Sequence, residues 1–131
     1  MRIQELNVYV VLFNGDRILV LKRKDGLWEF PGGGVDWGEH PEDSAVRELQ
    51  EETGITVQKP LRYLGITSAT YKKGENDKHS VYIVYAAETK TDRVQLCGEH
   101  TEYRWLTKTE LDFLRNNVSF GLNAEPVFDL I

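Results

Sequence analysis

The chain has 131 residues and a net charge of −5, which suits one domain with its own core and argues against general nucleic-acid binding, since phosphate contacts need a basic surface. A single cysteine, Cys97, excludes an internal disulfide and is typical of a reducing, cytoplasmic setting. No apolar run is long enough to span a membrane, and residues 1–5 lack the basic and apolar regions of a signal peptide.

The first thirty-four residues read as strands followed by glycines. Apolar runs at Leu6–Phe13 and Arg17–Lys24 flank turn residues at 14–16, which predicts two joined strands. A short strand, Trp28–Phe30, leads to three consecutive glycines at 32–34. Glycines there favour a tight turn or a close approach of the backbone to another group.

A helix is predicted over Pro41–Thr53. Pro41 fits the first helical position, where its missing N–H costs nothing, and Gly54 is placed to end the helix. At about 100° per residue, one stripe of side chains can pack on a sheet: Ala45, Val46, Leu49 and Thr53.

The second half of the chain predicts further strands. Leu61–Tyr71 and His79–Glu88 read as a second strand pair, joined by a polar, solvated turn over 72–78. Glu102–Leu106 is expected to close the sheet.

Two helices are predicted to follow these strands. Thr107 and Glu110 have capping-box spacing before Leu111–Leu114, and residues 123–131 should form a short terminal helix with Pro126 near its first turn. Strands interrupted by one helix and followed by others predict an α/β (α+β) fold, an α/β/α sandwich around a mixed sheet in a single domain, 1–131.

The acidic charge is concentrated in one segment. Residues 39–52 hold six acids and one base, while the rest of the chain balances at fifteen of each. Glu48, Glu51 and Glu52 fall in one arc of the helix, and Arg47 is placed to orient Glu48. These carboxylates repel one another, and a hard cation such as Mg²⁺ or Mn²⁺ would remove the repulsion. A solvated acidic face is the alternative interpretation.

Residues 33–55 resemble the Nudix box, Gly-x5-Glu-x7-Arg-Glu-(apolar)-x-Glu-Glu-x-Gly-(apolar). All nine specified positions are filled: Gly33, Glu39, Arg47, Glu48, Leu49, Glu51, Glu52, Gly54 and Ile55. The preceding segment, from Trp28 to Val35, resembles the lead-in of the MutT-type branch. The resemblance implies a Nudix-type sandwich and hydrolysis that depends on Mg²⁺ or Mn²⁺.

The resemblance also implies roles for individual residues. Glu48, Glu51 and Glu52 would be metal ligands with the Gly33 carbonyl nearby, and Arg47 would fix one glutamate. In MutT-type members a later loop glutamate reaches the metal cluster, and Glu99 matches its spacing better than Glu102. A solvated loop carboxylate is the alternative for Glu99.

Four residues are candidates for contacts with a substrate. Arg23 could bind a phosphate or base through its planar guanidinium, and Gly32 could allow close backbone approach. Trp28 and Tyr71 are candidates for stacking on a base, although aromatic residues of a sheet protein usually belong to its core. Tyr71 also resembles the downstream tyrosine of diadenosine polyphosphate hydrolases. Three histidines share no metal-ligand spacing and are interpreted as surface or hydrogen-bonded residues: His40, His79 and His100.

The predicted activity is hydrolysis of a nucleoside or deoxynucleoside triphosphate to a monophosphate and pyrophosphate. Diadenosine polyphosphates, ADP-ribose and nucleotide sugars are alternative substrates, and a nucleotide-binding module without catalysis is an alternative class. The expected partner is a small nucleotide, with no nucleic acid and no membrane. The oligomeric state stays open, a homodimer included.

Overall fold

Strand β1 (Arg2–Asn14) is the central strand of the sheet, as the computed structural model of residues 1–131 shows. Along one edge β1 pairs in parallel with β6 (Asn76–Glu88) over its whole length. Along the other edge it pairs in antiparallel register with β2 (Arg17–Arg23) and with β4 (Gly32–Gly34). Residues 8–12 of β1 are buried on both faces, which explains their continuous apolar run.

The remaining strands extend the sheet on both sides of this centre. The short strand β3 (Trp28–Glu29) and the closing strand β7 (His100–Thr107) both pair with β2. Strand β5 (Arg62–Lys73) pairs with β6 and forms the opposite edge. Since β1 and β6 are parallel and the other pairs are antiparallel, the predicted mixed sheet is confirmed.

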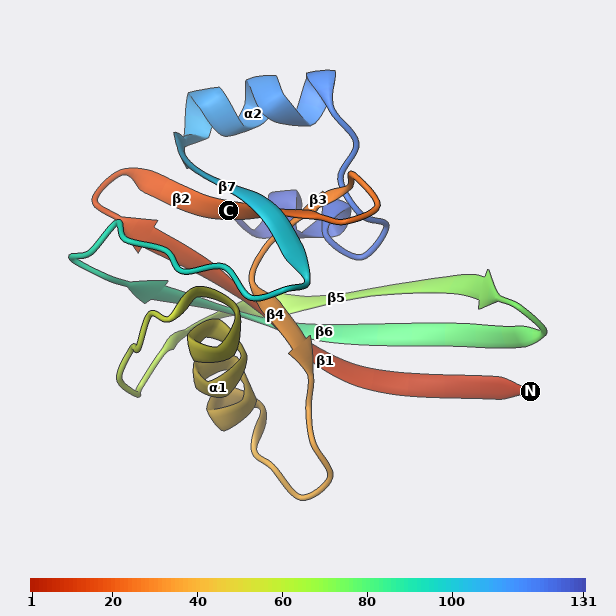
Figure 1. Cartoon of the computed structure of the whole chain (residues 1–131). Coiled ribbons are helices and arrows are strands. Elements are labelled where there is room, and N and C mark those ends of the chain that lie inside the picture. Colours follow the sequence, from red (N-terminus) through yellow and green to blue (C-terminus); the bar gives the residue numbers. More distant parts are fainter.

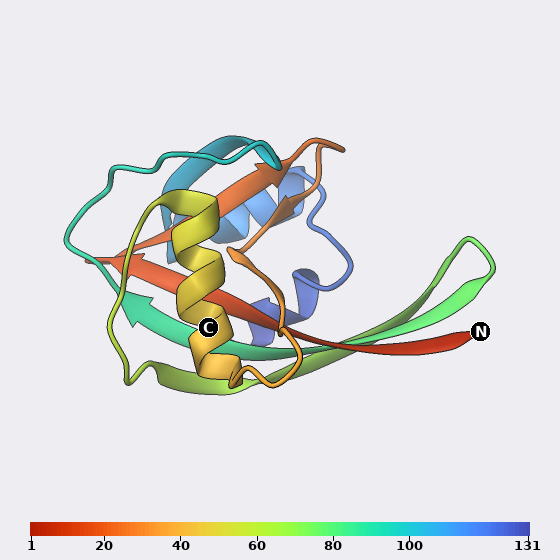
Figure 2. The same ribbon diagram turned by 60° about the horizontal axis from the view of Figure 1, so that its bottom comes forward.

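Helices cover both faces of the sheet, which confirms the predicted α/β/α sandwich. Alternate residues of β1 pack against α1 (Pro41–Thr53) in one core and against α2 (Lys108–Asn117) with the 3₁₀ helix η1 (Glu125–Leu130) in the other. Figure 1 shows α1 and α2 on opposite sides of the sheet, and Figure 2 shows α1 crossing in front of it.

Helix α1 begins and ends where the sequence predicts, and α2 begins where the sequence predicts. Helix α1 starts at Pro41 and ends at Gly54, which has a left-handed backbone with φ of 76°. Its predicted apolar stripe faces the sheet, with Ala45 and Leu49 fully buried. Thr107 and Glu110 form both hydrogen bonds of the capping box at the start of α2.

Several predicted boundaries are wrong. The solvated turn is shorter than the predicted 72–78, because β5 and β6 continue into this exposed polar segment and reverse only around Gly74, which has φ of 63°. Likewise β1 starts four residues before Leu6, and β7 starts at His100 rather than Glu102. The terminal helix is a 3₁₀ helix confined to Glu125–Leu130.

The first part of β1 and the β5–β6 hairpin project past the helices as a three-stranded ribbon (Figure 2). This ribbon explains why the predicted turn is too long, because strands with solvent on both faces carry polar residues without an apolar alternation. None of the helices has the length and apolar character that crossing a membrane requires.

Candidate active site

The side chain of Arg47 joins several acidic residues of the candidate site. Its guanidinium donates two hydrogen bonds to Glu39, at 3.0 and 2.9 Å, and one to Glu48, at 2.9 Å. A further hydrogen bond reaches the carbonyl of Gly34 at 3.0 Å. The bonds from Arg47, with one from Ser44, lower the pKa of Glu39 to about 2. Arg47 therefore contacts Glu48 as the spacing predicts, and Glu39 fixes Arg47 in turn.

Glu48 lies against the glycines that precede the helix. A Cβ atom on Gly33 would be only 2.6 Å from the carboxyl carbon of Glu48, so this packing requires glycine at position 33. Burial raises the pKa of Glu48, and the charges of Glu51 and Glu99 raise it further, although Arg47 opposes them.

Glu52 is the most deeply buried acid of the site. Its side chain is 4% exposed, and its Oε1 accepts a hydrogen bond of 2.6 Å from the backbone N–H of Gly32. Burial raises the pKa of Glu52 to about 9, against the effect of that bond, and Glu29, Glu48 and Glu99 raise it as well. Gly32 thus supports Glu52 through an N–H that is no longer free to bind a substrate.

Glu29, which the sequence did not single out, and His100 lie beside Glu52. Nε2 of His100 is 2.8 Å from Oε2 of Glu29, and its Nδ1 is 3.6 Å from Oε2 of Glu52. The His100 side chain is 1% exposed. The interpretation of His100 as a hydrogen-bonded residue is confirmed, and its burial beside Glu52 makes it a member of the site.

Glu51 and Glu99 occupy more peripheral positions. Glu51 is 54% exposed, its carboxylate interacts with Arg47 at 3.3 Å, and its charge raises the pKa of Glu48. Glu99 raises the pKa of both Glu48 and Glu52 and lines an open hollow together with Glu29 and His100. We call Glu29, Glu48, Glu52 and Glu99 the acidic cluster.

The acidic cluster fits a divalent cation. Ligand atoms of Glu29, Glu52 and His100 lie within 4.8 Å of one another, and the charges of Glu29, Glu48 and Glu99 help to raise the pKa of Glu52. Carboxylate oxygens are the ligands that Mg²⁺ and Mn²⁺ take in proteins. The raised pKa values of Glu48 and Glu52 mean that these carboxyl groups tend to keep their protons, and a bound cation would replace those protons.

The candidate substrate residues are divided between the site and other regions. Arg23 lines the hollow with Glu29, Glu99 and His100, where its guanidinium bonds to Asp25 at 2.6 Å. Trp28 is 2% exposed and belongs to the core, with the Arg104 guanidinium carbon 5.0 Å from its ring centroid, which contradicts the predicted stacking on a base.

Tyr71 lies outside the acidic cluster. Its hydroxyl is 3.2 Å from the hydroxyl of Ser80, and it lines a separate hollow beside Gln4 and His79. The structure therefore does not bring this predicted substrate residue to the acids of α1.

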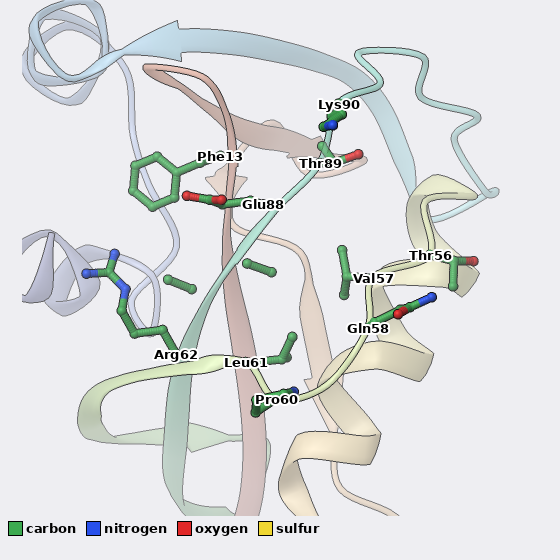
Figure 3. Close-up of a pocket in the computed structure, with 12 residues that line it drawn as sticks. Phe13, Thr56, Val57, Gln58, Pro60, Leu61, Arg62, Glu88, Thr89 and Lys90 are labelled. Atoms are coloured by element: carbon green, nitrogen blue, oxygen red, sulfur yellow. The ribbon is translucent and has the colours of Figure 1, made fainter.

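A hollow of about 870 Å³, larger than the one beside the acidic cluster, lies away from that cluster. It lies between the residues that follow α1 and the end of β6, and Figure 3 shows Val57, Pro60 and Lys90 among its walls. None of the predicted site residues lines it. A smaller hollow of about 350 Å³ is lined by Arg23 and Lys24 together with Glu29 and Glu99 of the acidic cluster.

The fold and the acidic cluster define a Nudix domain, and a family model described as NUDIX domain matches residues 4–125. The chain belongs to the Nudix hydrolase family.

Individual relatives share this domain. The chain is 34% identical over 91 residues to a bis(5'-nucleosyl)-tetraphosphatase (asymmetrical) of Rattus norvegicus, covering 67% of the chain and 62% of the relative. It is 30% identical over 126 residues to an RNA pyrophosphohydrolase of Vibrio cholerae, covering 95% and 66%. It spans smaller shares, 33% and 30%, of two other curated relatives.

Solved structures share the fold of the whole chain. A MutT NUDIX hydrolase from Burkholderia pseudomallei superposes with a TM-score of 0.79 at 24% identity, and 98% of each chain is covered. This likeness shows that the Nudix fold extends over nearly the whole length of the chain.

Proposed function

We propose that this protein hydrolyses the phosphoric anhydride of a nucleoside diphosphate linked to another group, with a divalent cation as cofactor. The first candidate substrate is a nucleoside or deoxynucleoside triphosphate, which would give a monophosphate and pyrophosphate. The observation that carries this proposal is the acidic cluster, in which ligand atoms of Glu29 and the buried Glu52 lie within 4.8 Å of each other and the charges of Glu48 and Glu99 also act on Glu52.

The chain's own residues have distinct parts in this reaction. Glu48 and Glu52 would hold the cation, with the predicted ligands Glu51 and the Gly33 carbonyl beside them. Arg47 holds Glu48 in place, and the Gly32 N–H holds Glu52. When bound, the cation neutralises phosphate oxygens and lowers the pKa of a coordinated water.

The hollow beside the cluster suits the phosphate chain of a nucleotide. Arg23 and Lys24 line it together with Glu99, and cationic side chains there would bind phosphate oxygens. As the water oxygen bonds to phosphorus and the anhydride P–O bond breaks, Glu99 would accept a proton from the water. No covalent intermediate with the protein is required.

A dinucleoside polyphosphate is the second candidate substrate. The relative from Rattus norvegicus carries a name for that activity, and 67% of the chain aligns with it. Such a substrate has the same anhydride linkage and differs in a second nucleoside, which the open side of the hollow would leave in solvent.

A substrate panel tests the proposal. The purified chain is incubated in Mg²⁺ with the common nucleoside and deoxynucleoside triphosphates, diadenosine tetraphosphate, ADP-ribose and a nucleotide sugar, and the products are separated by chromatography. We expect a nucleoside monophosphate with pyrophosphate, and incorporation of ¹⁸O from labelled water into one product locates the attacked phosphorus. Binding of these nucleotides without turnover in Mg²⁺ or Mn²⁺ would favour the non-catalytic module.

A further inference from the structure

His100 has a ring nitrogen that the fold leaves without a partner. Its Nδ1 is fully buried and makes no hydrogen bond, on a side chain that is 1% exposed. Buried polar atoms are almost always paired, so an unpaired one at a functional site points to a missing ligand.

The other ring nitrogen determines which chemistry Nδ1 offers. Nε2 is 2.8 Å from a carboxylate oxygen of Glu29. A carboxylate accepts but does not donate hydrogen bonds, so this contact places the ring hydrogen on Nε2. In the neutral imidazole Nδ1 then carries a free lone pair, and Oε2 of Glu52 is 3.6 Å away.

This distance is too long for a hydrogen bond and suits two ligands of one cation. Ligand atoms at about 2.1 Å from a metal are roughly 3 Å apart at a right angle and roughly 3.5 Å apart at a tetrahedral angle. The ligand atoms of Glu29, Glu52 and His100 all lie within 4.8 Å of one another. Glu29 bonded to His100 has the form of the carboxylate–histidine pairs that orient metal ligands in other proteins.

We propose that His100 and Glu52 jointly bind a divalent transition cation such as Mn²⁺ or Co²⁺, with Glu29 orienting the imidazole. The imidazole nitrogen selects these ions, because Mg²⁺ prefers oxygen ligands alone. This inference deepens the proposed function and rests on it for the role of the cation in turnover, whereas the binding of the cation can be measured without a substrate.

The direct test is the coordination of Mn²⁺ in the purified protein. Mn²⁺ is added to the metal-free chain, and pulsed electron paramagnetic resonance records whether ¹⁴N nuclei couple to the bound ion. We expect nitrogen coupling in the wild-type protein, its loss in His100→Gln, and its retention in His79→Gln. His79 is a matched control, because its ring nitrogen contacts Gln4 at 3.0 Å, away from the acidic cluster.

Affinity gives a second measurement. Titration calorimetry should show that the Kd for Mn²⁺ rises at least about tenfold in His100→Gln and about 10- to 100-fold in Glu29→Gln, while the Kd for Mg²⁺ changes less. Circular dichroism verifies that each variant is folded. If His100→Gln does not fold, the test uses the other two proteins. Nitrogen coupling in the wild type that weakens in Glu29→Gln supports the histidine ligand, and a wild type without nitrogen coupling overturns it.

Parallel turnover assays in Mg²⁺ separate this inference from the proposed function. Turnover together with bound Mn²⁺ that lacks nitrogen coupling overturns the histidine ligand and leaves the hydrolase proposal intact. Nitrogen-coupled Mn²⁺ in a protein that turns over no nucleotide supports the histidine ligand and contradicts the hydrolase.

Discussion

Replacing Glu52 by glutamine should stabilise the metal-free protein while it impairs catalysis. The pKa of Glu52 is about 9 in the folded chain, against an ordinary value of 4.5. Between these values the folded state keeps a proton that the unfolded state has released. The stability that this group contributes is therefore complete below pH 4.5 and is lost as pH rises towards 9.

The size of the effect follows from the pKa difference. From pH 4.5 to pH 7 the folded state loses at most about 3 kcal/mol through Glu52, at about 1.4 kcal/mol per pH unit. Glutamine removes this loss and preserves the acceptor for the Gly32 N–H, which bonds to Glu52 at 2.6 Å.

Urea unfolding followed by circular dichroism measures this difference. Both proteins are unfolded in EDTA at pH 5, 7 and 8.5, and the free energies of unfolding are compared. We expect Glu52→Gln to exceed the wild type increasingly as pH rises, by up to about 3 kcal/mol at pH 7, and added Mn²⁺ to stabilise the wild type more. A difference that does not grow with pH, or a variant less stable at pH 8.5, would refute the argument.

Further predictions concern catalysis. EDTA should abolish turnover and Mg²⁺ or Mn²⁺ should restore it, because the acidic cluster otherwise repels substrate phosphates; full activity in chelator would exclude the metal-dependent reaction. Glu51→Gln should lower kcat strongly with little change in Tm, since this side chain is 54% exposed; near-normal turnover would show that it is not a ligand. Glu99→Gln should lower kcat about 100-fold or more if it accepts the proton, whereas Glu102→Gln, which loses only exposed contacts with Lys22 and Arg104, should have little effect; equal small effects would remove Glu99 from the reaction. Gly33→Ala should lower kcat about 100-fold by displacing Glu48, because its Cβ would lie 2.6 Å from that carboxyl group; steady-state kinetics with an unchanged kcat would contradict this packing.

The sequence predicts α1 and its surroundings well because the determinants are local. Pro41 and Gly54 mark the ends of the helix, and the spacing of Ala45 and Leu49 identifies the buried side. The contact between Arg47 and Glu48 also follows from their adjacent positions. Each of these features depends on residues within one helix and its caps.

Glu29 and His100 could not be predicted in the same way because sheet pairing brings them together. They are 71 positions apart, and β2 lies between their strands, pairing Leu21 with Glu29 and Arg23 with His100. One local signal was present: Glu29 stands between Trp28 and Phe30, both buried, so strand alternation turns it to the opposite side. For His100 no pattern within β7 indicates burial.

The role of Trp28 illustrates another limit of the sequence. The aromatic ring of Trp28 and its position in the sequence are compatible either with stacking on a base or with packing in a core. The choice depends on Arg104 and on the residues around α2, which come much later in the chain. Only the folded structure shows that the ring is covered.

The parallel pairing of β1 with β6 has a consequence for how the protein acquires its activity. Partners in this register are 75 positions apart, so forming it closes a long loop, which is the kind of contact that slows folding. Helix α1 lies within that loop, and His100 follows it. A nascent chain therefore carries the complete acidic helix well before it has a competent site. A cation bound early by the helix alone would lack the buried contacts that Gly32 and His100 supply. The complete cation site, and with it catalytic activity, should therefore form only at the last, global step of folding.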